Sequence, residues 1–149
     1  MTNTENRVDT EACVERIESV CMAVVARDLE GVLDHFAEDC VFVNGVTGTT
    51  VPGKAELVNF LNDIWASFPE YTPRPVAAHL EQTTLGMLFE TTVELPATDE
   101  KASPDGTKVR WLTSSFFTFD PTSMKIIRDV YYADEAAVEQ MINEAGRAG

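Results

Sequence analysis

Apolar residues recur at helical spacing in the first half of the chain. In Thr10–Arg27 and again after Asp28, apolar side chains stand three or four residues apart, which predicts two amphipathic helices. A third apolar stripe runs through Lys54–Phe68, and Pro69 ends that helix because its ring cannot continue a helical backbone. Each segment is apolar along one face only, so each is expected to pack against another layer of the fold.

The second half of the chain shows the alternation of β-strands. In Leu85–Leu95 the odd-numbered positions are mostly apolar and the even-numbered ones mostly polar, which is typical of a strand with one buried face. Further strands are predicted at Cys40–Asn44, Val76–Gln82, Val109–Phe119 and Lys125–Tyr132. Helices followed by consecutive strands indicate an α+β fold, with the helices on one face of a curved, mostly antiparallel sheet. The open end of such a sheet commonly forms a cleft.

Turn-forming residues separate the predicted elements. Gly45–Gly53 is expected to be a loop and Ala97–Gly106 a long hairpin connection. Asp120 and Pro121 begin a turn between the last two strands. Asp134 is placed to cap a C-terminal helix.

Length and composition fit one domain. The chain has 149 residues, of which 44% are hydrophobic, and this is enough for a packed core. We expect the domain to cover residues 9–145 and the polar residues 1–8 to form a disordered tail.

The charge balance narrows the class of partner. The chain has 11 basic and 25 acidic residues and a net charge of −14. It offers no basic cluster for a phosphate backbone, so nucleic acid is not an expected partner. An acidic chain is also repelled by anionic membrane surfaces, and its charge favours solubility.

The cysteines indicate a reducing compartment. Cys13, Cys21 and Cys40 are an odd number without a CxxC pair, and the polar segment Met1–Thr10 does not look like a signal peptide. No apolar run has the length of a membrane span. We therefore expect a cytoplasmic protein in which the cysteines are small core residues.

Six segments, in order along the chain, resemble the nuclear-transport-factor-two-like superfamily. They are Ala26–Asn44, Pro52–Val58, Phe68–Tyr71, Asp105–Val109, Phe117–Asp120 and Lys125–Asp134. The closing segment and Phe68-Pro69 are most similar to the SnoaL-like polyketide cyclase branch. The resemblance implies a cone-shaped α+β barrel, in which a strongly curved sheet wraps around N-terminal helices, with a deep pocket and frequent homodimers. Isomerases, epoxide hydrolases, dehydratases, cyclases and binding modules share this fold, so the fold does not select the function.

Asn44 ends the first predicted strand, where ketosteroid isomerases of this superfamily carry the Asp that moves the proton. An amide cannot hold a proton near neutral pH, which argues against steroid isomerisation. Limonene-epoxide hydrolase-like enzymes carry an Asn at this place to orient the attacking water, and a Tyr where this chain has Phe42. Alternatively, Asn44 merely starts the loop, since asparagine favours turns.

Asp129 lies in the last predicted strand and shares a face with Tyr131. A buried carboxylate is costly unless it is paired or functional, and in a pocket its pKa would rise to suit acid/base work. The epoxide hydrolase-like family has a catalytic Asp on this strand, although an ungapped count back from Asp134 puts Tyr131 at that place. The alternative is a structural ion pair with Arg128, Arg110 or another basic residue.

Glu94 and Thr92 fall where the epoxide hydrolase-like family carries an Asp and an Arg. The bridging Arg is therefore missing, and a shift of one residue would put Val93 in place of the acid. Because Glu94 shares a face with Glu90, a solvated face is the competing interpretation.

The remaining candidates have weaker signals. His79 could carry a proton near neutral pH or serve as a surface or core partner. Trp65 and Trp111 could line a pocket or fill the core. Two separated histidines do not make a metal site, and no phosphate loop or nucleophile elbow appears, so we expect neither metal nor cofactor.

Two hypotheses follow. The first is a cofactor-independent enzyme that acts on a small hydrophobic carbonyl or epoxide substrate by acid/base chemistry, as a cyclase or isomerase, dehydratase or epoxide hydrolase. Asp129 would be the acid or base, with Asn44 and Tyr131 holding water or an oxygen. The expected substrate contacts are Phe42, Trp65, His79, Glu94 and Trp111. The second hypothesis is a non-catalytic small-molecule-binding or assembly module.

Overall fold

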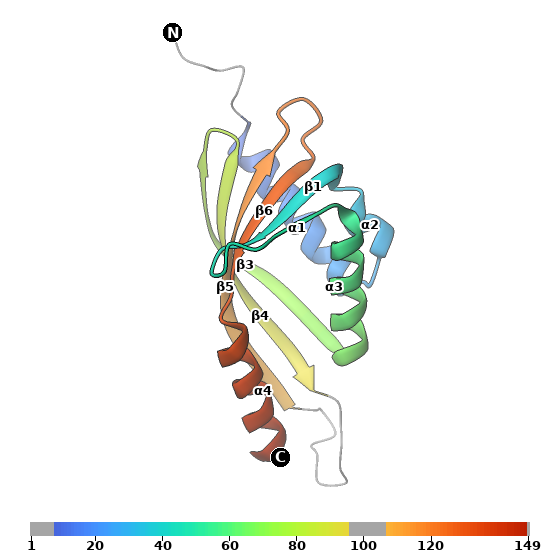
Figure 1. Cartoon of the computed structure of the whole chain (residues 1–149), viewed down its shortest axis with the longest axis vertical. Helices are drawn as coiled ribbons and strands as arrows, with labels where there is room; N and C mark the ends of the chain where they lie inside the picture. The colour runs from blue at the N-terminus through green and yellow to red at the C-terminus, as the bar shows by residue number, and fades with distance from the viewer. Residues whose placement is uncertain (1–7, 96–106, 149) are drawn as a thin grey trace.

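A curved six-stranded sheet forms the centre of the described structure (Figure 1). The computed structural model describes residues 8–95 and 107–148. Side by side, the strands are β2 (Thr50–Pro52), β1 (Phe36–Asn44), β6 (Ile126–Tyr132), β5 (Thr107–Phe119), β4 (Thr84–Leu95) and β3 (Glu70–Glu81). Neighbours pair antiparallel, except that β1 pairs parallel with β6.

The predicted α+β class with a mostly antiparallel sheet is confirmed, with one difference. Within the described residues, β2 and β3 each have a single neighbouring strand. The sheet is therefore strongly curved but open, rather than closed into the barrel that the resemblance implies.

Three N-terminal helices lie on one side of the sheet, and a fourth lies along the first half of β5 (Figure 1). They are α1 (Thr10–Val25), α2 (Leu29–Leu33), α3 (Lys54–Ser67) and α4 (Glu135–Ala148). Asp9, Asp28 and Asp134 precede α1, α2 and α4, and each accepts a hydrogen bond from the backbone N–H three residues further on, at 3.3, 2.9 and 3.0 Å. These bonds satisfy donors that a first helical turn leaves unpaired. The predicted cap at Asp134 is confirmed.

The concave face of the sheet carries the core. Every odd-numbered residue from Leu85 to Leu95 is buried and every even-numbered one is partly exposed, so the predicted alternation is confirmed. Leu85, Met87 and Phe89 pack with the apolar stripes of α1 and α3, whereas Val93 and Leu95 pack in a second cluster with Ile142 of α4. The most deeply buried side chains come from both layers and include Cys13, Ile17, Leu61, Leu85, Phe119 and Ile126. Burial of this apolar surface is the main source of stability.

The start of β3 differs from the prediction. The strand begins at Glu70 rather than Val76 and includes Pro73 and Pro75. Proline lacks the N–H group that a central strand needs, which suggested an interruption. Because β3 is an edge strand, the missing donors do not disrupt the sheet.

Smaller differences concern segment ends. β1 begins at Phe36 rather than Cys40, and β2 occupies part of the expected loop. Val8, expected in the tail, packs against the core. The rest of that tail and the expected connection at residues 97–106 lie outside the described residues.

Arg27 ties the end of α1 to the end of α3. It has a φ of 58°, a left-handed conformation that glycine usually supplies after a helix. Its guanidinium donates hydrogen bonds to the backbone oxygens of Trp65, Phe68 and Pro69, at 2.7, 2.7 and 2.9 Å. Carbonyls at the end of α3 thereby gain partners, and α3 is held beside α1.

Two substitutions at Arg27 separate the side chain from the backbone. Arg27→Ala loses the three hydrogen bonds and keeps the left-handed backbone, so we expect the free energy of unfolding to fall by about 1–3 kcal/mol. Arg27→Gly loses the same bonds, but glycine adopts the left-handed conformation without steric strain. Arg27→Gly should therefore be up to about 1 kcal/mol more stable than Arg27→Ala. Urea denaturation measures both differences. Equal stability of the wild type and Arg27→Ala would contradict a role for the guanidinium.

Candidate active site

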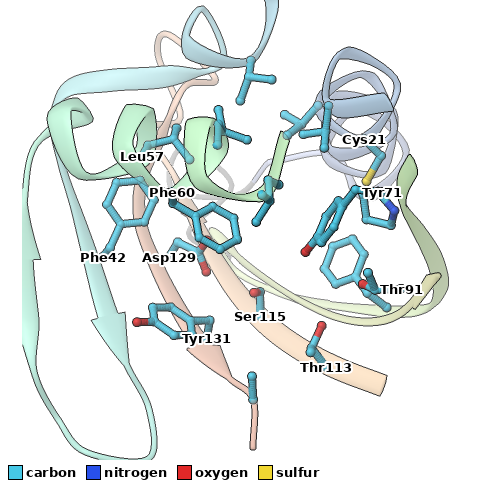
Figure 2. Close-up of a pocket in the computed structure, with 18 of the residues that line it drawn as sticks. Cys21, Phe42, Leu57, Phe60, Tyr71, Thr91, Thr113, Ser115, Asp129 and Tyr131 are labelled. Carbon is cyan, nitrogen blue, oxygen red and sulfur yellow. The ribbon is translucent and has the colours of Figure 1, made fainter. Parts of the chain in front are cut away.

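A cavity of about 580 Å³ lies between the concave face of the sheet and the helices (Figure 2). Its wall is mostly apolar. α1 and α3 contribute Ile17 and Leu61, the strands contribute Phe89 and Phe117, and α4 contributes Ile142. A volume of this size suits a small organic molecule.

Asp129 is a wall residue of this cavity (Figure 2). In the strand register it lies between Phe42 of β1 and Phe117 of β5, both of which also line the cavity. Its Oδ1 atom is buried and has no hydrogen-bond partner among the residues that the structure describes. A buried carboxyl oxygen without a partner is costly in a structural role, so its presence points to a ligand or to chemistry.

The surroundings of Asp129 favour the protonated carboxyl. Burial raises its pKa from 3.8 to about 7, and a hydrogen bond with the Ser115 side chain opposes part of this rise. Arg110 and Arg128, the expected ion-pair partners, are register partners of Thr92 and Thr118 on the convex face. Within residues 8–95 and 107–148, no salt bridge reaches Asp129. The ion-pair interpretation is therefore wrong for the described structure.

Tyr131 lies two residues from Asp129 and also lines the cavity (Figure 2). Its register partner on β1 is Asn44. Burial, together with the nearby Glu135 carboxylate, raises the pKa of the Tyr131 hydroxyl, whereas a hydrogen bond with the Asn44 side chain lowers it. Tyr131 therefore remains a neutral phenol that can donate a hydrogen bond in the cavity.

Asn44 itself is not part of the cavity wall. Its Oδ1 accepts hydrogen bonds from the backbone N–H groups of Val46 and Thr47, at 3.0 and 3.2 Å. Because these bonds fix the oxygen in the turn, the amide NH₂ is the group left for Tyr131. The Asn44 side chain thus stabilises the turn, as the turn interpretation expects, and its amide neighbours Tyr131 rather than the cavity.

The five expected substrate contacts divide into two groups. Phe42 and Trp111 line the cavity. Trp65 does not, because its indole Nε1 donates a 3.0 Å hydrogen bond to the Val24 oxygen and joins α3 to α1. His79 and Glu94 lie opposite Gly86 and Lys108 on the convex face. The structure therefore corrects the placement of Trp65, His79 and Glu94, since side chains alternate between the two faces of a strand.

Five hydroxyl-bearing residues in the wall were not predicted, and Tyr132 at the end of β6 is one of them. Tyr71, Thr91, Thr113 and Ser115 all line the cavity (Figure 2). Three of them could have been noticed in the sequence. Thr91, Thr113 and Ser115 are polar residues at odd-numbered strand positions that are otherwise mostly apolar. Their polarity alone did not show that these positions share one face with Asp129.

The three cysteines are not placed as nucleophiles. Cys13, Cys21 and Cys40 are buried and free, and burial raises the pKa of Cys21, which lines the cavity, to about 12. Its thiol therefore stays protonated.

Among residues 8–95 and 107–148, no group of three or more His, Cys, Asp or Glu side chains could hold a metal ion. No helix of that part is long and apolar enough to cross a membrane.

The Asp129 carboxyl should give stability an unusual pH dependence. Its folded-state pKa is about 7 against an ordinary 3.8, so between these values the folded protein holds a proton that the unfolded chain has lost. Stability therefore falls as the pH rises from about 4 to about 7 and is level above that range. Asp129→Asn lacks this cost, so at pH 8 it should exceed the wild type by on the order of a few kcal/mol, with little difference at pH 4.

Urea denaturation at several pH values measures this difference, and carboxyl ¹³C chemical shifts report the titration directly. An Asp129 carboxyl that titrates near its ordinary pKa would contradict the burial argument.

The fold and sequence have known relatives. Residues 17–129, more than half of the chain, match the SnoaL-like domain. A candidate polyketide cyclase from Xanthomonas campestris pv. campestris has a TM-score of 0.71 and 19% identity, over 89% of this chain and 97% of that one. A protein with a ketosteroid isomerase-like fold from Catenulispora acidiphila, solved with trimethylamine, has a TM-score of 0.68 and 14% identity, over 89% and 92%.

TerC, crystallised with polyporic acid, has a TM-score of 0.67 and 19% identity, over 88% of this chain and 98% of that one. At these identities the likeness shows the fold alone. A search of curated proteins gave no match. The match over residues 17–129 shows that this chain belongs to the SnoaL-like domain family.

Proposed function

We propose that this protein is a cofactor-independent enzyme that moves a proton on a small hydrophobic carbonyl compound, as an isomerase or cyclase would. One observation carries the proposal. A carboxyl with a pKa of about 7 lines an apolar cavity, and one of its oxygens lacks a partner. A general acid or base works best when its pKa lies near the working pH.

The chain supplies each part of such a reaction. The Asp129 carboxylate takes a proton from the carbon next to the carbonyl, and the electron pair moves to the carbonyl oxygen. Tyr131 lines the same cavity two residues from Asp129, and its hydroxyl would donate a hydrogen bond to that oxygen, while Asn44 would orient the phenol. The protonated Asp129 then returns the proton. A general base of this kind accelerates the reaction roughly 10²–10⁴-fold, and one hydrogen-bond donor to the developing oxyanion accelerates it about 10²–10³-fold.

The geometry favours a carbonyl over an epoxide substrate. In the epoxide hydrolase-like arrangement, an Asn orients water and an Arg bridges two acids. Here Asn44 is outside the cavity wall, and Thr92 and Glu94 lie on the convex face. Relatives of this fold have been crystallised with the small molecules polyporic acid and trimethylamine, which supports a small-molecule ligand.

Proton exchange at a carbon next to a carbonyl tests the proposal without knowledge of the natural substrate. We expect the protein to accelerate exchange of the α-protons of 2-tetralone in D₂O, followed by NMR, with a rate that rises towards about pH 7 as the carboxylate forms. Asp129→Asn should lower this rate by about 10²–10⁴-fold. Asp63→Asn, which changes an exposed aspartate of α3, should keep it.

The alternative function, a non-catalytic binding module, has its own outcome. The wild type would bind 2-tetralone without accelerating exchange, and Asp129→Asn would behave like the wild type. A third outcome is possible. If the wild type opens an epoxide such as styrene oxide and Asp129→Asn does not, the substrate is an epoxide rather than a carbonyl compound.

The homodimer that the resemblance implies remains a prediction, and the convex face offers the surface for it. Large apolar side chains are exposed there, including Leu112 at 60% and Phe116 at 43%. Phe116 stacks edge-on with Tyr132, with ring centroids 5.9 Å apart. Exposed apolar patches of this kind often mark interfaces. The cytoplasmic location and the absence of nucleic-acid partners also remain predictions from the sequence.

A charge at this face should separate dimers. If the convex face is the interface, Phe116→Glu should shift the protein to a monomer, because a carboxylate would be buried at the contact. Val46→Glu places the same charge at an exposed apolar residue of the loop after β1 and should leave the dimer intact. Sedimentation equilibrium measures both. A wild type that is monomeric at high concentration would contradict the prediction.

A further inference from the structure

A second polar pair lies in the cavity, away from Asp129. Tyr71 of β3 and Thr91 of β4 both line the wall, and Figure 2 shows them on the opposite side of the cavity from Asp129 and Tyr131. Thr91 is 3% exposed and Ser115 is 9% exposed, and both carry their hydroxyls on the concave face of the sheet. Ser115 serves Asp129, so Thr91 is the buried hydroxyl that the proposed reaction does not use.

The strand register sets this pair apart from the reacting end. On β5, Asp129 lies opposite Phe117 and Thr91 lies opposite Trp111, six positions further along. At about 3.3 Å per residue, these backbone positions are roughly 20 Å apart along the strand. The Tyr71 ring shortens this gap, because its hydroxyl points towards the middle of the cavity (Figure 2).

The pair is built to meet a neutral oxygen. Burial raises the pKa of the Tyr71 hydroxyl to about 12, and a hydrogen bond with Thr91 opposes the rise, so the phenol stays protonated. The charged side chains of the wall are Glu56, Asp129, Glu135 and Glu139, and all are acidic. A carboxylate or phosphate on the ligand would therefore meet repulsion and no cation.

The wall between the two ends is mainly apolar. Thr113 is the cavity-lining residue of β5 between Trp111 and Ser115, and Phe89 lies opposite Thr113 on β4. The opposite side of the cavity is formed by apolar residues of α1 and α3 such as Ile17 and Leu61. A ligand that touches both polar ends thus has an apolar middle.

We propose that Tyr71 and Thr91 form a second recognition point, which binds a neutral hydroxyl or carbonyl oxygen at the far end of an elongated, uncharged substrate whose other end reacts at Asp129. This inference rests on the proposed function for the identity of the reacting end. It adds that the substrate carries at least two oxygen functions joined by an apolar skeleton. Tyr71 and Thr91 are then specificity residues, since they hold the substrate without touching the reacting atoms.

Matched mono- and dihydroxy probes test this recognition point. The pairs are 2-naphthol with 2,6-dihydroxynaphthalene, 4-hydroxybiphenyl with 4,4′-dihydroxybiphenyl, and 4-hydroxystilbene with 4,4′-dihydroxystilbene, which differ in length. In at least one pair the diol should bind more tightly by about five- to tenfold, the worth of one neutral hydrogen bond. 4′-Hydroxybiphenyl-4-carboxylate should bind more weakly than 4-hydroxybiphenyl. Isothermal titration calorimetry gives the dissociation constants.

Variants of the pair should remove the preference selectively. Tyr71→Phe and Thr91→Val should each bring the diol down to the affinity of its monohydroxy partner, whereas Thr91→Ser, which keeps the hydroxyl, should restore the preference. Thr92→Val changes the neighbouring residue on the convex face and should leave the preference intact. Thermal unfolding checks that each variant is folded.

The result separates this inference from the proposed function. A diol preference that persists in Asp129→Asn supports the recognition point, whether or not 2-tetralone exchange is catalysed. No diol preference in any pair, or one that Tyr71→Phe and Thr91→Val leave unchanged, overturns it even if exchange is catalysed. If 4′-hydroxybiphenyl-4-carboxylate binds more tightly than 4-hydroxybiphenyl, the inference that the substrate is uncharged is wrong.

Discussion

The parallel pairing of β1 with β6 and the antiparallel pairing of β6 with β5 place Asp129 between Phe42 and Phe117. Because side chains alternate along a strand, a slip of one residue in β6 would turn Asp129 to solvent and bring Arg128 or Val130 into the cavity. The apolar residues of the concave face specify this register, since any slip would expose part of the core. The core therefore fixes the position of the carboxyl, and the chemistry depends on that position.

A carboxyl at this place lowers stability and gains reactivity for the same reason. Burial favours the protonated form and leaves Oδ1 without a partner. The surrounding core compensates for this cost through its buried apolar surface, and Ser115 offsets a part of it. Tyr131 lies two residues from Asp129 on the same strand, and Asn44 is its register partner on β1. The polar groups are thus held by regular strands rather than by loops, which keeps their geometry precise.

Much of the fold could be predicted from local patterns. Apolar spacing identified the helices, and alternation identified β4, β5 and β6 almost to the residue. The start of β3 was predicted too late, because its first residues include prolines, which only an edge strand tolerates. A single sequence does not show which strand lies at an edge. For the site, alternation correctly put Asp129 and Tyr131 on one face, but it could not show which face of each strand meets the helices. His79 and Glu94 were therefore expected in a cavity from which the register excludes them.

Local patterns in the sequence are sufficient for the helices and most strands, the α+β class, the acidic charge and the presence of one carboxyl on the otherwise apolar face of the last strand. These properties depend on residues near one another in the chain. Three features come from the tertiary structure: within the described residues no salt bridge reaches Asp129, Asn44 neighbours Tyr131 but lies outside the cavity wall, and Tyr71 and Thr91 line the cavity at the side opposite Asp129. The reason is that each of these features joins residues from different strands, and strand register and sheet curvature are set by the packing of the whole core.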